Sequence, residues 1–193
     1  MLKHIRRFAK ARDGLAAIEF AFIAPVMATM LMGTIELCQA LECHQKVTLV
    51  ASSAADLVAQ TTSVSSSDMN DVFSAASAII YPFSQNNVSI VVSSVLSDGS
   101  GNGTVAWSRA NANGTALTPG DPVTLSQPLM STCDVNGGNC TPCAKGTCSV
   151  IYAQVSYAYV PLISQHIFGA TTMSDYFFER PRKSATVTCT DCN

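Results

Sequence analysis

The sequence has little charge, and most of its positive charge lies at one end. Only 12% of the 193 residues are charged, and five of the eleven Lys and Arg residues precede Gly14. The six that remain are scattered, apart from a small cluster at residues 180–183, so they form no basic face of the kind that binds nucleic acid. The sequence therefore predicts no nucleic-acid partner.

Sequence motifs of common enzyme classes are also missing. The chain contains no GxSxG nucleophile elbow, no phosphate-binding loop and no HExxH. Its carboxylates are too sparse to suggest a paired acid/base site. We therefore expect a protein that is not an enzyme and that carries no cofactor and no metal.

A long apolar segment is the most prominent feature that the sequence does have. The run from Phe20 to Ile35 carries no charge, and its flanks extend it to about 27 residues, 15–41. A helix of that length spans about 40 Å, which is longer than the core of a secretory signal and long enough to cross a bilayer. The basic residues before Gly14 favour a cytoplasmic N-terminus. We therefore expect a single-pass membrane anchor that exports the rest of the chain.

Two residues inside this segment are unusual. Glu19 places a carboxylate one turn inside the apolar helix, where it costs roughly 2.5–3.5 kcal/mol at the bilayer centre and less near the interface. It either marks the cytoplasmic edge of an ordinary anchor or has a partner. Pro25 removes one backbone hydrogen bond from the helix and favours a kink.

The residues around Glu19 carry a family resemblance. Gly14, followed five residues later by Glu19 and then Phe20, lies between a basic leader and a hydrophobic helix, and this resembles the processing site of type IV pilin-like precursors. The family that the chain most resembles is the TadE-like pseudopilins, the minor pilins of the tight-adherence (Flp, type IVc) pilus system. The segments 33–36 and 180–182 also resemble this family.

The resemblance implies a maturation step and a set of partners. A prepilin peptidase would cleave between Gly14 and Leu15, and Glu19, followed by Phe20, would pair with the freed amino terminus of a neighbouring subunit. The implied partners are the major Flp pilin, other minor pseudopilins and the inner-membrane assembly platform. The implied location is the bacterial inner membrane, with the head periplasmic or extracellular, and the subunit either stays there or enters the pilus.

The remaining pattern predicts an α+β fold, in which a long pilin-like N-terminal helix carries a small head with antiparallel strands. We divide the chain into a cleaved leader (1–14), a transmembrane helix (15–41), an amphipathic continuation (42–60) and an extracytoplasmic head (61–193). Past Glu36, the helix is predicted to pack on the head through an apolar stripe. Its members are Leu37, Leu41, Val47, Val50, Ala54 and Leu57.

Within the head, a second helix is expected after an N-cap at Ser67, ending at Pro82. Period-two alternation predicts strands at residues 88–96 and 104–109, which form a hairpin, and strands at 149–160 and 184–190. Residues 162–178 are aromatic and apolar without a clean period, and no element is assigned to them.

Eight cysteines in an exported chain predict structural disulfides whose connectivity the sequence leaves open. They are Cys38, Cys43, Cys133, Cys140, Cys143, Cys148, Cys189 and Cys192. Two CxxC pairs, 140–143 and 189–192, also fit a zinc site or, for the first pair, a redox dithiol.

The functional prediction is a minor pilin that takes part in assembling an adhesive Flp-type pilus. Two alternatives from other classes stay open at this point. One is a membrane-tethered periplasmic thiol-disulfide protein that uses Cys140 and Cys143. The other is an adhesin or binding module held by an uncleaved anchor.

Overall fold

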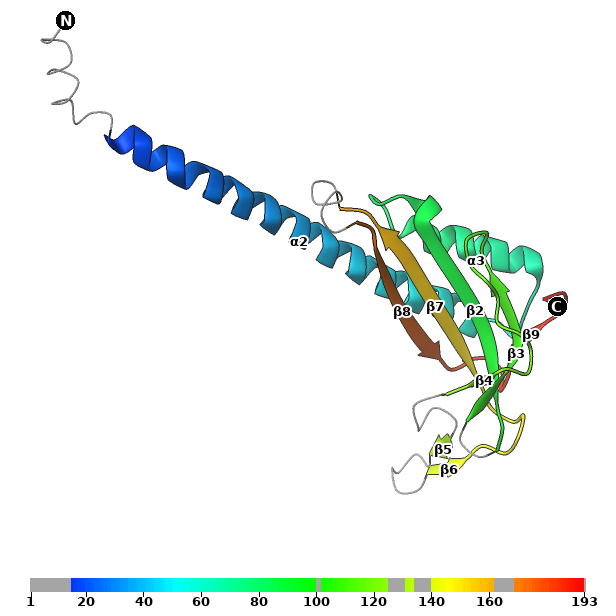
Figure 1. Ribbon diagram of the computed structural model, residues 1–193. Coiled ribbons are helices and arrows are strands. Elements are labelled where there is room, and N and C mark those ends of the chain that lie inside the picture. The colour runs from blue at the N-terminus through cyan, green and yellow to red at the C-terminus, as the bar shows by residue number, and fades with distance from the viewer. Residues whose placement is uncertain (1–14, 100–101, 125–130, 134–139, 162–168, 193) are drawn as a thin grey trace, which may run out of the picture.

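The computed structural model describes residues 15–99, 102–124, 131–133, 140–161 and 169–192. The predicted leader lies outside these residues. A single long helix, α2, projects from an α+β head (Figure 1). In the head an antiparallel sheet is covered by helices on one face, which confirms the predicted fold class.

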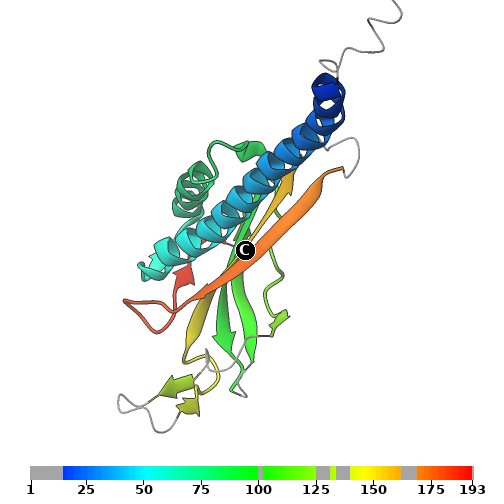
Figure 2. The same cartoon turned by 90° about the vertical axis from the view of Figure 1, so that its left-hand side faces the viewer.

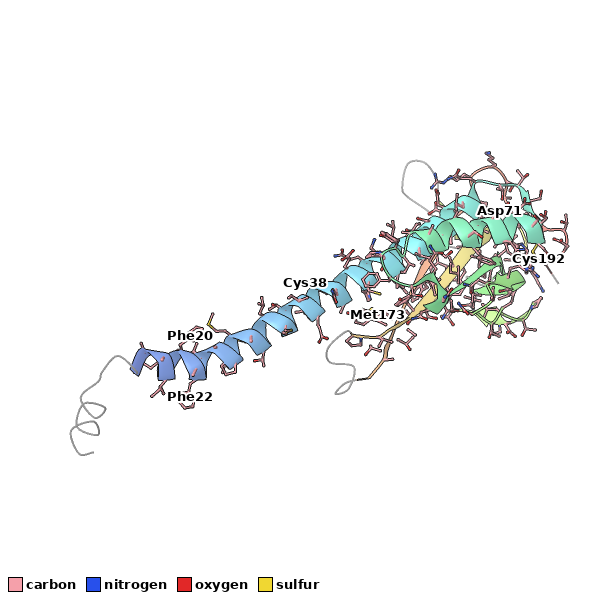
Figure 3. The ribbon with its side chains drawn as sticks, turned by 90° about the horizontal axis from the view of Figure 1, so that it is seen from above. Phe20, Phe22, Cys38, Asp71, Met173 and Cys192 are labelled. Carbon is pink, nitrogen blue, oxygen red and sulfur yellow. A yellow bond between two sulfur atoms is a disulfide. The ribbon has the colours of Figure 1, made fainter. Side chains whose placement is uncertain are left out.

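Helix α2 (Leu15–Ala59) runs without interruption from the predicted anchor into the head. Its 45 residues correspond to about 68 Å. The first half projects beyond the head, and the second half lies against it (Figures 1 and 3). The helix continues through Pro25, so the predicted kink at that residue stays a prediction.

The head is built on a five-stranded sheet in the order β4-β3-β2-β7-β8, in which all neighbours are antiparallel. The predicted hairpin and the strong third strand are confirmed as β2, β3 and β7. The bounds of the strands are β2 (Val88–Ser97), β3 (Gly103–Ala110), β4 (Pro122–Val123), β7 (Ser149–Tyr159) and β8 (Thr171–Glu179).

Two parts of the strand prediction need correction. Strand β8 lies in a stretch that the sequence left without an element. It is an edge strand whose exposed and half-buried residues do not alternate cleanly, so its sequence shows no period of two. The predicted strand at 184–190 is reduced to β9 (Thr188–Cys189), which pairs in parallel with β1 (Ser63–Val64) outside the main sheet.

Helix α3 (Ser66–Ala78) begins two residues earlier than predicted. Its N-cap is Ser65 rather than Ser67, because Ser65 and Asp68 form a capping box in which each side chain bonds the other residue's backbone N–H. The chain then passes through a cis Tyr81–Pro82 bond and the short 3₁₀ helix η1 (Gln85–Asn87) before entering β2.

The core lies between one face of the sheet and the two helices, with α3 beside the second half of α2 (Figure 2). Inward-facing residues of β7 alternate as predicted, from Ile151 to Tyr159. The indole N–H of Trp107 in β3 donates to the carbonyl of Val187, 2.8 Å away, and so ties the C-terminal segment to the core.

A small hairpin, β5 (Ser131–Cys133) and β6 (Cys140–Pro142), occupies the predicted cysteine loop. Its register places Cys133 directly opposite Cys140. This hairpin lies below the main sheet and away from α2 (Figure 1).

Candidate functional site

The exposed half of α2 is the first part of the candidate site. Its large apolar side chains face outward, with 70% of Phe20 and 75% of Phe22 exposed (Figure 3). By length and composition, α2 is the one helix among the described residues that could cross a membrane, and its most apolar window is not covered by the head. A water-exposed helix of this composition would be costly, so its first half is compatible with a single-pass anchor.

The two threonine hydroxyls of this half are bonded within the helix. The hydroxyls of Thr29 and Thr34 donate to the carbonyls of Val26 and Leu31, at 2.9 and 2.7 Å, which suits a lipid environment. Glu19 is exposed and forms no ion pair with the described residues. Of the predicted processing pair, Leu15 is the first residue of α2 and Gly14 lies outside the described residues.

The second half of α2 is part of the head's core. Its buried residues recur at spacings of three and four, which defines one helical face. They are Cys43, Val47, Val50, Ala51, Ala54, Ala55, Val58 and Ala59.

The predicted stripe was therefore wrong at three of its six positions. Leu37, Leu41 and Leu57 are exposed, because the buried face passes through Cys43 and Val58 instead. The prediction accepted apolar residues spaced three to six positions apart, and this range does not distinguish the buried side of the helix from the exposed side.

Three contacts hold this half of α2 against strand β8 and the segment after it. Thr48 donates a hydrogen bond to the Asp175 carboxylate in β8. Arg182 donates its backbone N–H to the carbonyl of Ala59, 2.8 Å away, and its guanidinium lies 2.5 Å from the Asp56 carboxylate. A basic residue at the C-terminal end of a helix also interacts favourably with the helix dipole.

Sequence reasoning did not find these contacts. The segment 180–182 was singled out only for its family resemblance, and the structure gives Arg182 a role in holding the helix end. The signal in the sequence was weak, since a basic cluster near the end of a chain has no recognisable partner until the fold brings Asp56 beside it.

Among the cysteines whose side chains the structure describes, four form two disulfides and two are free thiols. Cys143 is bonded to Cys148, and Cys189 is bonded to Cys192. The redox dithiol considered for residues 140–143 is therefore not formed, because Cys143 has a partner five residues downstream.

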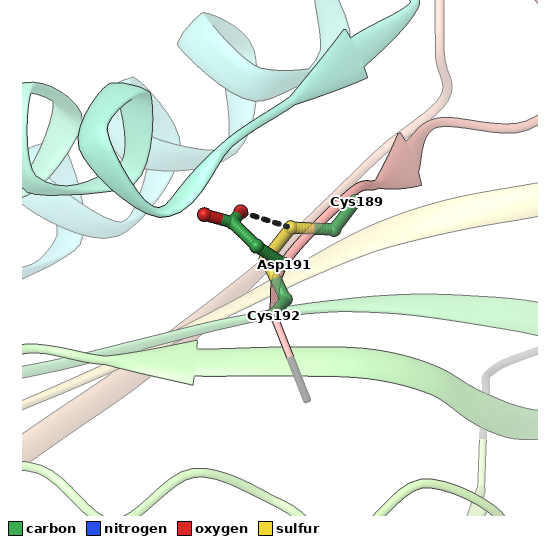
Figure 4. Close-up of side chains that lie close together, drawn as sticks. All are labelled: Cys189, Asp191 and Cys192. Carbon is green, nitrogen blue, oxygen red and sulfur yellow. Dashed lines mark hydrogen bonds between the residues drawn. A yellow bond between two sulfur atoms is a disulfide. The ribbon is translucent and has the colours of Figure 1, made fainter.

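The second CxxC pair closes a loop at the start of α3. Asp191 lies between the bonded Cys189 and Cys192 (Figure 4). Its carboxylate accepts from the backbone N–H of Ser66 at 2.6 Å, so it caps the first turn of α3. Because the sulfurs of Cys143, Cys189 and Cys192 are held in disulfides, they are not thiolates that could bind the considered zinc.

Cys38 and Cys43 are free, so these two of the eight cysteines proposed as disulfide partners form no disulfide. Cys38 is exposed on α2 before the head begins, whereas Cys43 is fully buried (Figure 3). Burial, with a smaller contribution from the charge of Glu42, raises the pKa of the Cys43 thiol from 9.0 to about 11. Cys43 is therefore a packing residue and an unreactive thiol.

Comparison with known proteins finds a family match at the N-terminal end of the chain. Residues 14–56 match a family described as TadE-like protein. The chain carries a TadE-like N-terminal segment. No curated protein and no solved structure matches the chain.

The TadE-like segment coincides with most of helix α2. It covers the exposed half with Glu19 and the buried half up to Asp56, the residue that binds Arg182. The match confirms the resemblance seen in the sequence, and it indicates a protein associated with the Tad/Flp pilus. The TadE-like family is not known as enzymatic.

Proposed function

We propose that this chain is a minor pilin-like subunit, a pseudopilin, that takes part in assembly of a tight-adherence (Flp) pilus and that acts structurally rather than as an enzyme. The observation that carries the proposal is the two-part helix α2. One continuous helix presents a bare apolar half and buries its other half in a folded head, and both halves lie in the TadE-like segment. A subunit of this shape can stand in a membrane and present its head on one side.

In this proposal the leader is removed by a prepilin peptidase between Gly14 and Leu15. The mature chain sits in the inner membrane, with its N-terminus at the cytoplasmic side and its head outside. Its partners are the major Flp pilin, other minor pseudopilins and the assembly platform.

Glu19 and the adjacent Phe20 have a role in subunit pairing. A carboxylate in an exposed apolar helix is unfavourable in lipid unless it meets a positive charge. Cleavage supplies that charge on the freed amino group of a neighbouring subunit. Supporting this role, Glu19 forms no ion pair with the described residues of its own chain.

The test is the N-terminus of the mature protein, purified from membranes of cells with and without prepilin peptidase. A start at Leu15 that depends on the peptidase is the expected result. An intact Met1 would contradict processing and would favour an anchored adhesin or binding module.

A second measurement separates assembly from insertion. Glu19→Ala is expected to insert normally and to impair piliation. Thr29→Ala is the matched control, because it removes a polar group from the same apolar helix whose hydroxyl is already bonded internally. Normal piliation by the Glu19 variant would remove this residue from the functional list.

A further inference from the structure

A cavity of about 330 Å³ lies where the bare half of α2 meets the head. Its lining comes from three parts of the chain: α2, the loop after α3, and the C-terminal end of β7. This volume is at the small end of the range for ligand pockets, about 300–1,000 Å³. The cavity is distinct from the pairing residues at the other end of α2.

The position of the cavity along α2 sets its depth relative to a membrane. Gln39 and Glu42 line it, and they follow Ile35, the last residue of the uncharged run, by about 6 and 10 Å of helix. The headgroup region adds roughly 5–8 Å on each side of the hydrocarbon. If α2 spans the bilayer as proposed above, Gln39 therefore lies at the level of the lipid headgroups and Glu42 just outside them, so the cavity opens at the outer edge of the headgroup region.

The end of the head beside the cavity has the side chains of an interfacial surface. Tyr81, which is 74% exposed, precedes the cavity-lining loop, and Val160, which lines the cavity at the end of β7, is also exposed. Tyrosines are enriched at the level of the headgroups because their rings are amphipathic. This end of the head is thus suited to contact the membrane surface.

The walls of the cavity are aromatic. Phe83 meets Tyr157 and Tyr159 edge to face, with ring centroids 6.3 and 6.2 Å apart. Both tyrosines are almost fully buried, so the three rings form a fixed wall. Aromatic rings attract alkylammonium groups through their negative faces.

The charge at the mouth of the cavity favours a cation. The Glu42 side chain is half exposed, and Glu36, six residues earlier on α2, acts electrostatically on Tyr159. The positive group beside them is Lys46, whose Nζ lies 3.9 Å from the Glu42 carboxylate, at the outer limit of an ion pair. This pair is weak because its carboxylate is half exposed and its atoms are far apart, so Glu42 can bind a second cation.

We propose that this cavity binds the ammonium headgroup of a membrane lipid, such as phosphatidylethanolamine, with Glu42 opposite the ammonium and the aromatic wall beside it. Lipid is the source chosen because of the cavity's depth beside α2. Binding would fix the head against the membrane surface while α2 stays in the bilayer. The inference rests on the anchor part of the proposed function.

The experiment uses the full chain in detergent, supplied with equal amounts of phosphatidylethanolamine and phosphatidylglycerol, and native mass spectrometry counts the lipids retained. The wild-type protein is expected to enrich phosphatidylethanolamine. Glu42→Gln should reduce the enrichment about two- to fivefold, the factor that an exposed ion pair supplies. Glu42→Lys should reverse the preference toward phosphatidylglycerol, which a merely structural role of Glu42 would not do.

Asp71→Asn is the matched control, because it removes the same charge from an exposed position on α3. It should leave the enrichment unchanged, as Asp71 does not line the cavity (Figure 3). Equal retention of both lipids by the wild type, or an unchanged preference in Glu42→Lys, would overturn the proposal. Selective binding of Nα-acetyl-lysine amide, which keeps its ε-ammonium group, in place of lipid would also overturn the proposal, since it would indicate that the cavity binds a lysine of a partner protein.

Co-sedimentation with vesicles distinguishes this inference from the proposed function. A chain that inserts into vesicles of either lipid without headgroup preference would refute the cavity's role alone. A chain that inserts into neither would refute the anchor and, with it, this inference.

Discussion

The contact between Arg182 and the end of α2 is the sharpest test of how the helix and the head are joined. The guanidinium lies 2.5 Å from the Asp56 carboxylate and 3.3 Å from that of Glu179. Exposed ion pairs contribute about 0.2–1 kcal/mol. Because 57% of the Arg182 side chain and 37% of the Asp56 side chain are exposed, solvent screens the pair, and its short distance places it near the upper end, about 1 kcal/mol.

A double-mutant cycle measures this term. Asp56→Ala, Arg182→Ala and the double variant are unfolded with urea as full chains in detergent, and the free energy of unfolding is followed by the fluorescence of Trp107. This residue is the protein's single tryptophan and lies in the core of the head. The cycle removes the contribution of Glu179, because that contact is lost in both backgrounds that lack Arg182.

The expected coupling is about 1 kcal/mol, and it should shrink at high salt because both partners are partly exposed. The backbone bond from Arg182 to Ala59 survives every substitution in the cycle. A coupling of zero would show that the backbone bond alone holds the helix end. A coupling of several kcal/mol that ignores salt would contradict the screening argument.

Two further predictions concern the free thiols and the start of α3. In the folded chain a maleimide should label Cys38 readily and Cys43 hardly at all, because a pKa of about 11 lowers the thiolate fraction at about pH 8 roughly 100-fold, before burial is counted. Mass spectrometry of Cys38→Ser and Cys43→Ser checks this: only the first should lose a label, unless urea is added. At the start of α3, hydrogen bonds from Ser65 lower the pKa of Asp68. A carboxyl whose pKa is lower in the folded state than in the unfolded state stabilises the fold at any pH above its unfolded-state pKa. This stabilisation is lost as the pH falls through the folded-state pKa, so the urea midpoint of Asp68→Asn should drop less than that of the wild type between about pH 5 and about pH 2. An equal drop in both proteins would exclude Asp68 as a source of acid sensitivity.

Several elements follow from local pattern alone. The apolar run, in which Pro25 and Gly33 are the only poor helix formers, and the apolar spacing after it determine α2 almost to its last residue. The strict alternation from residue 149 onward determines β7, and the Gly-rich connection between β2 and β3 determines their hairpin. In each case neighbouring residues share the same backbone preference, so no distant contact is needed to choose the structure. The TadE-like features are of the same local kind.

Other features depend on contacts between distant parts of the chain, and only the tertiary structure decided them. Polar and apolar residues do not alternate regularly along strand β8, because one face of the strand packs against α2 and the residues of the other face differ in their exposure to solvent. The partner of Cys143 is Cys148 rather than Cys140, since the chain turns back near Gly146 and brings residues 143 and 148 to a Cα separation of 5.9 Å.

The junction of anchor and head is the clearest case of this dependence. No local signal separates Cys43, which is buried, from Leu41, which is exposed, because both are apolar positions of one helix. Their difference arises only where the sheet and α3 press on one side of α2. The cavity beside Glu42 forms at that same junction, and the Arg182 contact forms about 20 Å farther along α2, at its C-terminal end. At both places the sequence by itself determined the helix, and the packing of the head decided which residues each side of the helix contacts.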